Sequence, residues 1–121
     1  MACVFCQLGR SLLAQSDLSC AFLDGFPVSS GHALVVPKRH VGSIWEMTDR
    51  EYIDAFNLVK QVKDLLQERF DPHGFNIGVN CGEAAGQTVF HAHIHIIPRY
   101  AGDVPNPRGG VRNVIPGKGD Y

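Results

Sequence analysis

The chain has 121 residues, of which 45% are hydrophobic and 19% are charged, and this is enough apolar material for the core of one domain of ordinary size. The composition excludes an intrinsically disordered chain. Eleven Lys and Arg residues against twelve Asp and Glu residues give a formal net charge of -1, which argues against broad electrostatic attraction to nucleic acid or to a membrane surface. No stretch has the apolar length of a signal peptide or a membrane-spanning helix, so we expect a cytoplasmic protein with no nucleic-acid or membrane partner.

The first elements expected along the chain are two strands, over residues 18–23 and 32–37. Glycine, proline and serine residues separate these apolar runs, which is typical of a turn between antiparallel strands. Residues 48–70 then carry apolar side chains at helical spacing, so we predict one long amphipathic helix that packs on a sheet. Thr48 and Glu51 fit a capping box at its start. The expected apolar face consists of Tyr52, Ile53, Phe56, Val59, Val62, Leu65, Leu66 and Phe70.

Two more strands are expected after the helix, over residues 75–81 and 88–97, with a loop between them. The second of these carries His91, His93 and His95 at every second position, and the side chains of a strand alternate between its two faces. The three imidazole rings are therefore expected on one face. Because adjacent imidazoles each need hydrogen-bond partners, a functional site explains them better than a polar strand surface or a site for metal alone.

The chain is expected to form one domain over residues 1–99, because no repeat, low-complexity run or linker interrupts it, followed by a tail over residues 100–121. The tail is rich in glycine and proline and too irregular for a helix or a central strand. We expect it to wrap the domain or a partner subunit. Its cations, Arg108, Arg112 and Lys118, also suit a segment that closes over a polyphosphate.

The histidine spacing carries a family resemblance. The segment HAHIHII at residues 91–97 resembles the signature of the histidine-triad (HIT) family, in which three alternating histidines precede two apolar residues. Residues 22–24, GHALVVPKRH at residues 31–40 and NCGEAAGQTVFHAHIHIIPR at residues 80–99 are similar to further blocks of that family, and the resemblance covers residues 3–99. The expected elements and the resemblance both imply an α+β fold, with an antiparallel sheet of about five strands and one main helix. The resemblance adds a homodimer.

The resemblance also implies a two-step reaction on a nucleoside phosphate. The middle histidine, His93, would attack the phosphorus and form a covalent nucleotidyl intermediate, which water then hydrolyses. A neutral imidazole is a competent nucleophile when its other nitrogen donates a hydrogen bond that fixes the tautomer. His95 would donate a hydrogen bond to a phosphate or to the leaving group. The residues implied to contact the substrate are Asp24 at the ribose hydroxyls, Asn80 and Gln87 at the phosphate, and Thr88 at the pocket wall.

The reaction class that follows is hydrolysis or nucleotidyl transfer at the α-phosphate of a nucleotide. The triad does not choose between a dinucleoside polyphosphate, such as diadenosine tetraphosphate, and a purine nucleoside phosphoramidate. The basic tail favours the polyphosphate. A zinc-clamped module that binds nucleotides without turnover is the alternative from another class.

Cys3 and Cys6 are the closely spaced pair among four cysteines, and in a reducing compartment such a pair suits a metal clip or a redox couple. With His40 and His91 they look like the Cys-Cys-His-His zinc site of many members of the family, and this ligand set suits tetrahedral Zn²⁺. We therefore expect a structural zinc ion, with redox use of the pair or a simple clamp of the N-terminal segment as alternatives. His32 is expected only to anchor the strand that follows it.

Overall fold

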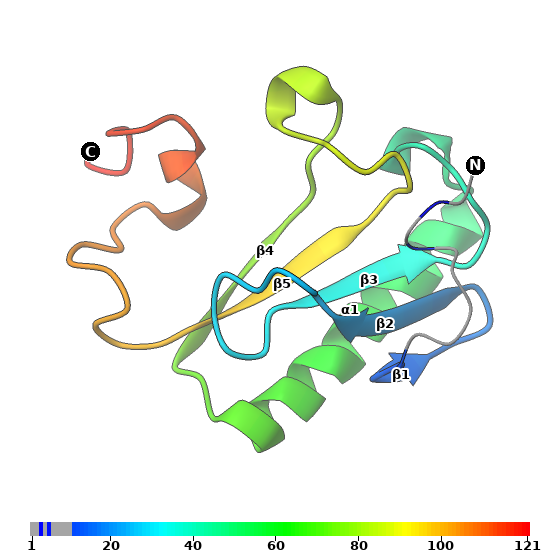
Figure 1. The fold of residues 1–121 in the computed structure, drawn as a ribbon, viewed down its shortest axis with the longest axis horizontal. Helices are drawn as coiled ribbons and strands as arrows, with labels where there is room; N and C mark the ends of the chain where they lie inside the picture. Colours follow the sequence, from blue (N-terminus) through cyan, green and yellow to red (C-terminus); the bar gives the residue numbers. More distant parts are fainter. Residues whose placement is uncertain (1–2, 4, 6–10) are drawn as a thin grey trace.

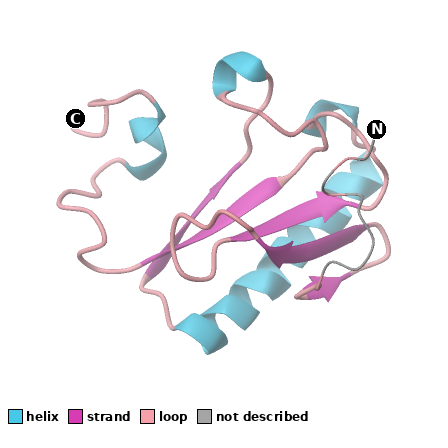
Figure 2. Cartoon of the chain, viewed as in Figure 1, coloured by secondary structure: helices cyan, strands magenta, loops and turns pink. Residues whose placement is uncertain are grey.

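The fold is an antiparallel sheet with one long helix packed on one face (Figure 1). The computed structural model describes residue 3, residue 5 and residues 11–121. Within these residues the helices are α1 (Asp49–Phe70) and the 3-10 turns η1 (Ile44–Glu46), η2 (Glu83–Ala85) and η3 (Gly110–Val114). The strands are β1 (Ala14–Gln15), β2 (Ser19–Leu23), β3 (Ala33–Pro37), β4 (Gly74–Gly78) and β5 (Ile94–Arg99), in the sheet order β1-β2-β3-β5-β4 (Figure 2). The expected α+β class, with about five antiparallel strands and one main helix, is confirmed.

Local sequence signals set both ends of α1. At its start the Glu51 N–H donates to Thr48 Oγ1 (3.1 Å), and the Glu51 carboxylate accepts from the Thr48 N–H (2.8 Å), which is the expected capping box. At its end Asp71 adopts the left-handed conformation with φ 51°, and its N–H donates to the Gln67 carbonyl (3.1 Å). Pro72 follows and cannot continue the helix. No helix in the described part of the chain is long and apolar enough to cross a membrane.

Strand β5 begins later than the expected strand over residues 88–97, so of the three histidines only His95 lies on a strand. The preceding residues leave the sheet because their polar groups bond elsewhere. The Ala92 N–H donates to the Val41 carbonyl (2.8 Å), and a ring nitrogen of His91 donates to the carbonyl at the end of β3 (2.8 Å). The expected start of this strand is therefore wrong, since tertiary contacts outside the ladder take these groups.

The expected strand over residues 75–81 also ends early, at Gly78. Its ladder partner β5 begins at Ile94, and Gly78 pairs with the next residue of β5. Only Ile94 is therefore left on β5 for a further backbone pair after Gly78. The chain turns instead into the loop that carries η2. This loop lies beyond the end of the sheet at which β4 ends and β5 begins (Figure 1).

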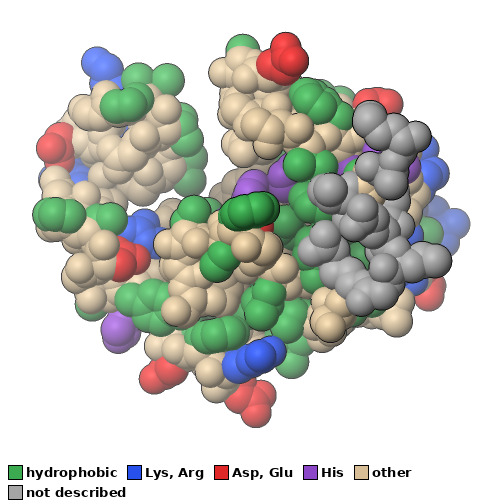
Figure 3. Space-filling model, in the orientation of Figure 1, with side chains coloured by type: hydrophobic (Ala, Val, Ile, Leu, Met, Phe, Trp, Pro, Cys, Tyr) green, Lys and Arg blue, Asp and Glu red, His purple; other side chains and the backbone are tan. Residues whose placement is uncertain are grey.

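Residues 100–121 leave the sheet after β5 and fold beside β4, which η3 contacts. The Tyr100 hydroxyl donates to the Ser30 carbonyl (2.7 Å), and Arg99 forms an ion pair with Asp103 (2.7 Å). These contacts fix the start of the tail. Figure 3 shows a deep notch between the rest of the tail and the body of the molecule, with histidine side chains at its floor.

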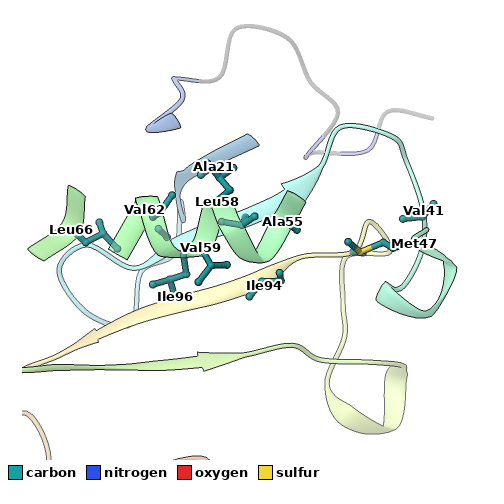
Figure 4. Packing of buried hydrophobic residues seen from close by; sticks show 13 residues of the cluster. Ala21, Val41, Met47, Ala55, Leu58, Val59, Val62, Leu66, Ile94 and Ile96 are labelled. Atoms are coloured by element: carbon teal, nitrogen blue, oxygen red, sulfur yellow. The ribbon is translucent and has the colours of Figure 1, made fainter. Parts of the chain in front are cut away.

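The hydrophobic core lies between α1 and the sheet (Figure 4). Buried apolar residues of the helix pack against buried residues of three strands, and they are Ala55, Leu58, Val62 and Leu66 against Ala21, Val35, Ile94 and Ile96. The expected helix face is too broad, because Ile53, Phe56 and Leu65 are 64%, 44% and 41% exposed. Side chains alternate along β5, so His95 lies on the sheet face that α1 leaves uncovered.

Candidate functional site

The candidate site is built on the uncovered face of the sheet. Across this face Phe22 on β2 pairs with Leu34 on β3. Leu34 pairs in turn with His95 on β5, and His95 pairs with Gly78 on β4. A Cβ on Gly78 would meet no atom within 4 Å, so the surface beside His95 is open.

The hairpin between β2 and β3 adds two polar side chains to this face. The Asp24 N–H donates to the His32 carbonyl (2.9 Å), which continues the ladder by one pair. Side chains two positions apart on a strand share a face, so Asp24 joins Phe22 and His32 joins Leu34. Gly31 permits the turn, because its φ is 89° and a Cβ there would lie 2.8 Å from an aromatic ring of α1.

A pocket of about 430 Å³ lies over this face. Five of the residues expected at the site line it, and they are Asp24, Asn80, Thr88, His93 and His95. Its apolar wall includes Phe22, Phe26 and Leu34, together with Phe5, which was not expected there. The Phe5 ring lies edge-on to the His93 ring, with centroids 5.0 Å apart. An aromatic wall facing a carboxylate and neutral donors suits a nucleoside, which has an apolar base and a polar ribose.

The ring of His93 is 8% exposed and is oriented by its own loop. Its Nδ1 lies 2.9 Å from the carbonyl oxygen of His91. A carbonyl oxygen can only accept, so Nδ1 carries the proton and donates it. The lone pair of His93 is therefore on Nε2, which is the tautomer that a nucleophilic imidazole requires.

His32 sets the proton arrangement of His95. The Val28 N–H donates to His32 Nδ1 (3.1 Å), so Nδ1 is the unprotonated nitrogen of His32. His32 Nε2 then carries the proton and donates it to His95 Nδ1 (2.9 Å). His95 in turn keeps its proton on Nε2, where it is a hydrogen-bond donor. Asp24 lies beside this chain of contacts, with a carboxylate oxygen 3.5 Å from His32 Nε2.

Burial keeps both rings of this chain neutral. It lowers the pKa of His95 to about 4, and the neighbouring rings of His93 and His32 add to the shift. Burial also lowers the pKa of His32, against the opposing pull of the Asp24 carboxylate. A protonated ring would donate from both nitrogens and break the chain, so the lowered pKa values preserve it at neutral pH.

Gln87 holds the loop beside the pocket. Its side-chain amide donates to the carbonyls of Gly42 (2.7 Å) and Val89 (3.1 Å), and its side-chain oxygen accepts from the Gly82 N–H (2.9 Å). The residue is buried and is absent from the described lining of the pocket. A direct contact between Gln87 and a phosphate stays a prediction, and its observed contacts give it a positioning role.

Comparison with known proteins agrees with this geometry, since a family model for the HIT domain matches residues 7–102. The chain belongs to the HIT family. Among its HIT relatives, adenosine 5'-monophosphoramidase hnt1 of Schizosaccharomyces pombe is 40% identical over 104 residues, which are 82% of this chain and 75% of that protein. The asymmetrical bis(5'-nucleosyl)-tetraphosphatase of the same organism is 38% identical over 96 residues, 79% of this chain and 53% of that protein, so the match spans about half of it. A Zn-bound histidine triad family protein from Mycobacterium smegmatis has a TM-score of 0.78 at 30% identity, over 87% of this chain and 80% of that chain.

One cluster in this HIT domain has the donor set of a metal site. Ligand atoms of Cys3, His40 and His91 lie within 4.8 Å of one another. Because His91 Nε2 donates to the carbonyl at the end of β3, its unprotonated Nδ1 lies 3.1 Å from His40 Nδ1 and 3.6 Å from Cys3 Sγ. Zinc bonds of about 2.0 to 2.3 Å place tetrahedral ligands about 3.3 to 3.8 Å apart, so these residues fit Zn²⁺. Cys6, the fourth expected ligand, lies outside the described residues.

A second cluster, formed by Asp24, His32 and His95, also has its ligand atoms within 4.8 Å of one another, but it does not fit a metal. His32 Nδ1 accepts from the Val28 N–H, so His32 Nε2 must carry the proton. A protonated nitrogen has no lone pair to give to a metal ion. The cluster is instead the hydrogen-bonded support of His95.

The arginines of the tail are engaged within the tail itself. Their guanidinium groups both contact the Tyr121 ring, with the Cζ atoms of Arg108 and Arg112 at 5.0 and 4.5 Å from its centroid. Arg108 also donates to the Tyr121 carbonyl, and Arg112 donates to the Lys118 carbonyl (2.9 Å). These contacts fold the tail back on itself. They weaken the expectation that the arginines bind a polyphosphate, because both guanidinium groups already contact Tyr121.

Proposed function

We propose that this protein is a nucleotide hydrolase or nucleotidyl transferase that breaks a bond at the α-phosphorus of a nucleotide through a covalent intermediate on His93. The observation that carries the proposal is the hydrogen bond from His93 Nδ1 to the His91 carbonyl, which leaves the Nε2 lone pair on a ring that lines the pocket. Two relatives named as hydrolases of nucleotide derivatives support the reaction class.

The proposed reaction has two steps. In the first, His93 Nε2 bonds to the phosphorus while the bond to the leaving group breaks, and the leaving group departs with the electron pair. In the second, water attacks the same phosphorus and the bond to His93 breaks. Across both steps His95 donates from Nε2 to an oxygen of the phosphate or to the leaving group.

Neutral donors and one carboxylate bind the nucleotide in this proposal. Asn80 and Thr88 line the pocket and offer an amide and a hydroxyl to the phosphate oxygens. Asp24 accepts from the ribose hydroxyls, and the Phe26 N–H holds one of its carboxylate oxygens in place (2.9 Å). These donors add no positive charge, so they bind the phosphate without protonating or repelling the attacking ring.

The leaving group is either the remainder of a dinucleoside polyphosphate, such as diadenosine tetraphosphate, or the amine of a nucleoside phosphoramidate. The names of the two S. pombe relatives cover both classes. The basic tail favoured the polyphosphate in the sequence, and its arginines are occupied by Tyr121 in the structure. A module that binds nucleotide without turnover is the remaining alternative.

We also propose one structural Zn²⁺ per chain, held by Cys3, Cys6, His40 and His91. The ion would contribute folding free energy and hold the N-terminal segment against the loop that carries His91. A homodimer and a cytoplasmic location are proposed from the likeness to the HIT family alone.

The test of the proposed function is His93→Ala. Turnover of adenosine 5'-phosphoramidate and of diadenosine tetraphosphate should fall by more than about 10³-fold, because His95, the other imidazole described at the pocket, holds its proton on Nε2. Binding of AMP, measured by calorimetry, should change little. Mass spectrometry of the wild-type protein after rapid quenching should show a nucleoside monophosphate adduct on His93.

His73→Ala is the matched control, because His73 is exposed and lies outside the pocket. Its turnover should equal that of the wild type. Near wild-type turnover by His93→Ala would refute the mechanism and favour a module that only binds nucleotide.

A further inference from the structure

The hairpin between β2 and β3 carries an aromatic side chain that the fold itself does not bury. Phe26 is 91% exposed, the highest value among the large hydrophobic residues of the described chain, and it nonetheless lines the pocket of about 430 Å³ over the sheet. Isolated exposed apolar side chains are common on protein surfaces. A ring that is exposed and also lines a pocket is a different case, because a ligand in that pocket would cover it.

The backbone of Phe26 places its ring next to the proposed ribose contact. The Phe26 N–H donates to Asp24 Oδ1 (2.9 Å), while Asp24 Oδ2 lies 3.5 Å from His32 Nε2. In a nucleotide the base is bonded to the ribose carbon beside the one that carries the 2'-hydroxyl. A ribose that donates to Asp24 therefore brings its base within reach of the side chain two positions further along the chain, which is Phe26.

The two other phenylalanines that line the pocket are held by packing. Phe22 is 1% exposed and belongs to the sheet face beneath the pocket. The ring of Phe5 lies against the rings of Phe22 and His93, with centroids 5.5 and 5.0 Å apart. These rings offer a fixed surface to one face of a base. The second face of that base needs another partner, and Phe26 is the exposed aromatic residue among the described residues that line the pocket.

The Phe26 ring can turn onto a base while the hairpin keeps its shape. Pro27 follows directly and restricts the backbone of Phe26 to extended conformations, and the N–H of Phe26 is held by Asp24. The side chain itself is exposed, and exposed side chains change rotamer within picoseconds to nanoseconds. Rotation about the side-chain bonds of Phe26 is therefore enough to cover a base, and the ribose contact at Asp24 is left in place.

We propose that Phe26 is the cover of the nucleobase: its ring turns onto the face of the base opposite to Phe5 and Phe22, and the base is held between them. The proposal rests on the function proposed above, because it needs a nucleotide in the pocket. Aromatic side chains stack on every kind of base, since each base has a π-face. Phe26 thus adds affinity for the base, whereas the carboxylate and the neutral donors of the pocket contact the sugar and the phosphate.

The test compares AMP with ribose 5-phosphate, which keeps the sugar and the phosphate and lacks the base. The Kd of each compound is measured by NMR titration of the wild-type protein and of Phe26→Ala. The Kd for AMP should be about 5- to 50-fold higher in the variant, as expected when one stacked aromatic ring is lost. The Kd for ribose 5-phosphate should stay within twofold, because the N–H that holds Asp24 remains in the variant.

Val28→Ala is the matched control, since Val28 is 71% exposed on the same hairpin and is absent from the described lining of this pocket. Its Kd for AMP should stay within twofold of the wild type. Phe26→Trp keeps an aromatic ring and should bind AMP within about threefold of the wild type. Because the side chain of Phe26 is exposed, its truncation removes no core packing, and circular dichroism should show that all three variants are folded.

The outcomes separate this inference from the proposed function, because the readout is binding and does not depend on turnover by His93. If the wild-type protein binds AMP no more tightly than ribose 5-phosphate, the pocket does not recognise a nucleoside, and both proposals fail. An unchanged Kd for AMP in Phe26→Ala, or an equal rise for both compounds, overturns the inference alone. If Phe26→Ala changes the oligomeric state in size-exclusion chromatography and weakens both compounds alike, a second copy of the chain covers the ring, and the inference is also overturned.

Discussion

Replacing His32 by alanine removes a ring that lies behind His95 and leaves every proposed substrate contact in place. In the structure the Val28 N–H, His32 and His95 form a chain of two hydrogen bonds, of 3.1 and 2.9 Å, that ends in a proton on His95 Nε2. Without His32, the Nδ1 of His95 loses its donor, and the ring is free to carry its proton on either nitrogen. We expect His32→Ala to lower kcat more than it changes KM.

The size of the effect follows from the lost hydrogen bond. A buried polar group that loses its partner costs about 1 to 3 kcal/mol. If the free energy of the transition state rises by this amount, kcat falls by about 5- to 150-fold. The pH profile should change as well, because the ring of His32 helps to lower the pKa of His95, and its removal should move the acid limb of kcat/KM to higher pH.

The assay is the pH dependence of phosphoramidate hydrolysis, with folding checked by circular dichroism. His32→Gln is the conservative variant, since its side-chain N–H can reach His95 Nδ1, and it should recover part of the lost rate. His73→Ala serves as the control for removal of an exposed histidine. If folded His32→Ala keeps a rate within twofold of the wild type and an unchanged profile, the reasoning about the hydrogen-bond chain is wrong.

Leu66 is fully buried against the sheet, so Leu66→Ala should lower the free energy of unfolding by about 2 to 5 kcal/mol in urea titrations, whereas Leu65→Ala next to it, at a site 41% exposed, should cost less than about 1 kcal/mol. Chelation of zinc, or Cys3→Ser, should lower the Tm in calorimetry, and metal analysis that finds no zinc in the protein as purified would contradict the proposed site. The pKa of His95 is about 4 in the folded protein and about 6.5 in the unfolded chain, so the unfolded state binds the proton first as the pH falls. The free energy of unfolding should therefore decrease between pH 6.5 and 4, and this decrease should be smaller in His95→Gln; equal slopes in the two proteins would show that the pKa is not shifted.

The sequence predicts the parts of the fold that local chemistry controls. The capping box at Thr48 and Glu51 sets the start of α1 because both bonds join residues three apart. The helix face was less predictable, because Ile53 and Phe56 have the same helical spacing as the buried residues and differ only in where the sheet lies. Tertiary packing, which spacing does not contain, decides between them.

The site shows the same division. The spacing of His93 and His95 marks them as site residues, whereas the sequence alone predicts His32 only as a strand anchor, because its contact with His95 depends on strand register. The pairing of Leu34 with His95 places His32 beside His95, and neither residue carries a local signal of this. The contact of the tail arginines with Tyr121 is not predictable from the sequence for a similar reason, since no local pattern links these residues.

His91 connects the candidate metal cluster to the ring of His93 through its own backbone. The side chain of His91 lies against Cys3 and His40, while its carbonyl oxygen orients the ring of His93. A rotation of this peptide would therefore tilt the ring of His93, the proposed nucleophile, even though the His91 side chain lies outside the pocket lining. Loss of a ligand at the proposed zinc site would then change the orientation of the His93 ring. A His91 variant that folds normally is therefore expected to react slowly, because the proposed attacking nitrogen no longer points at the phosphorus.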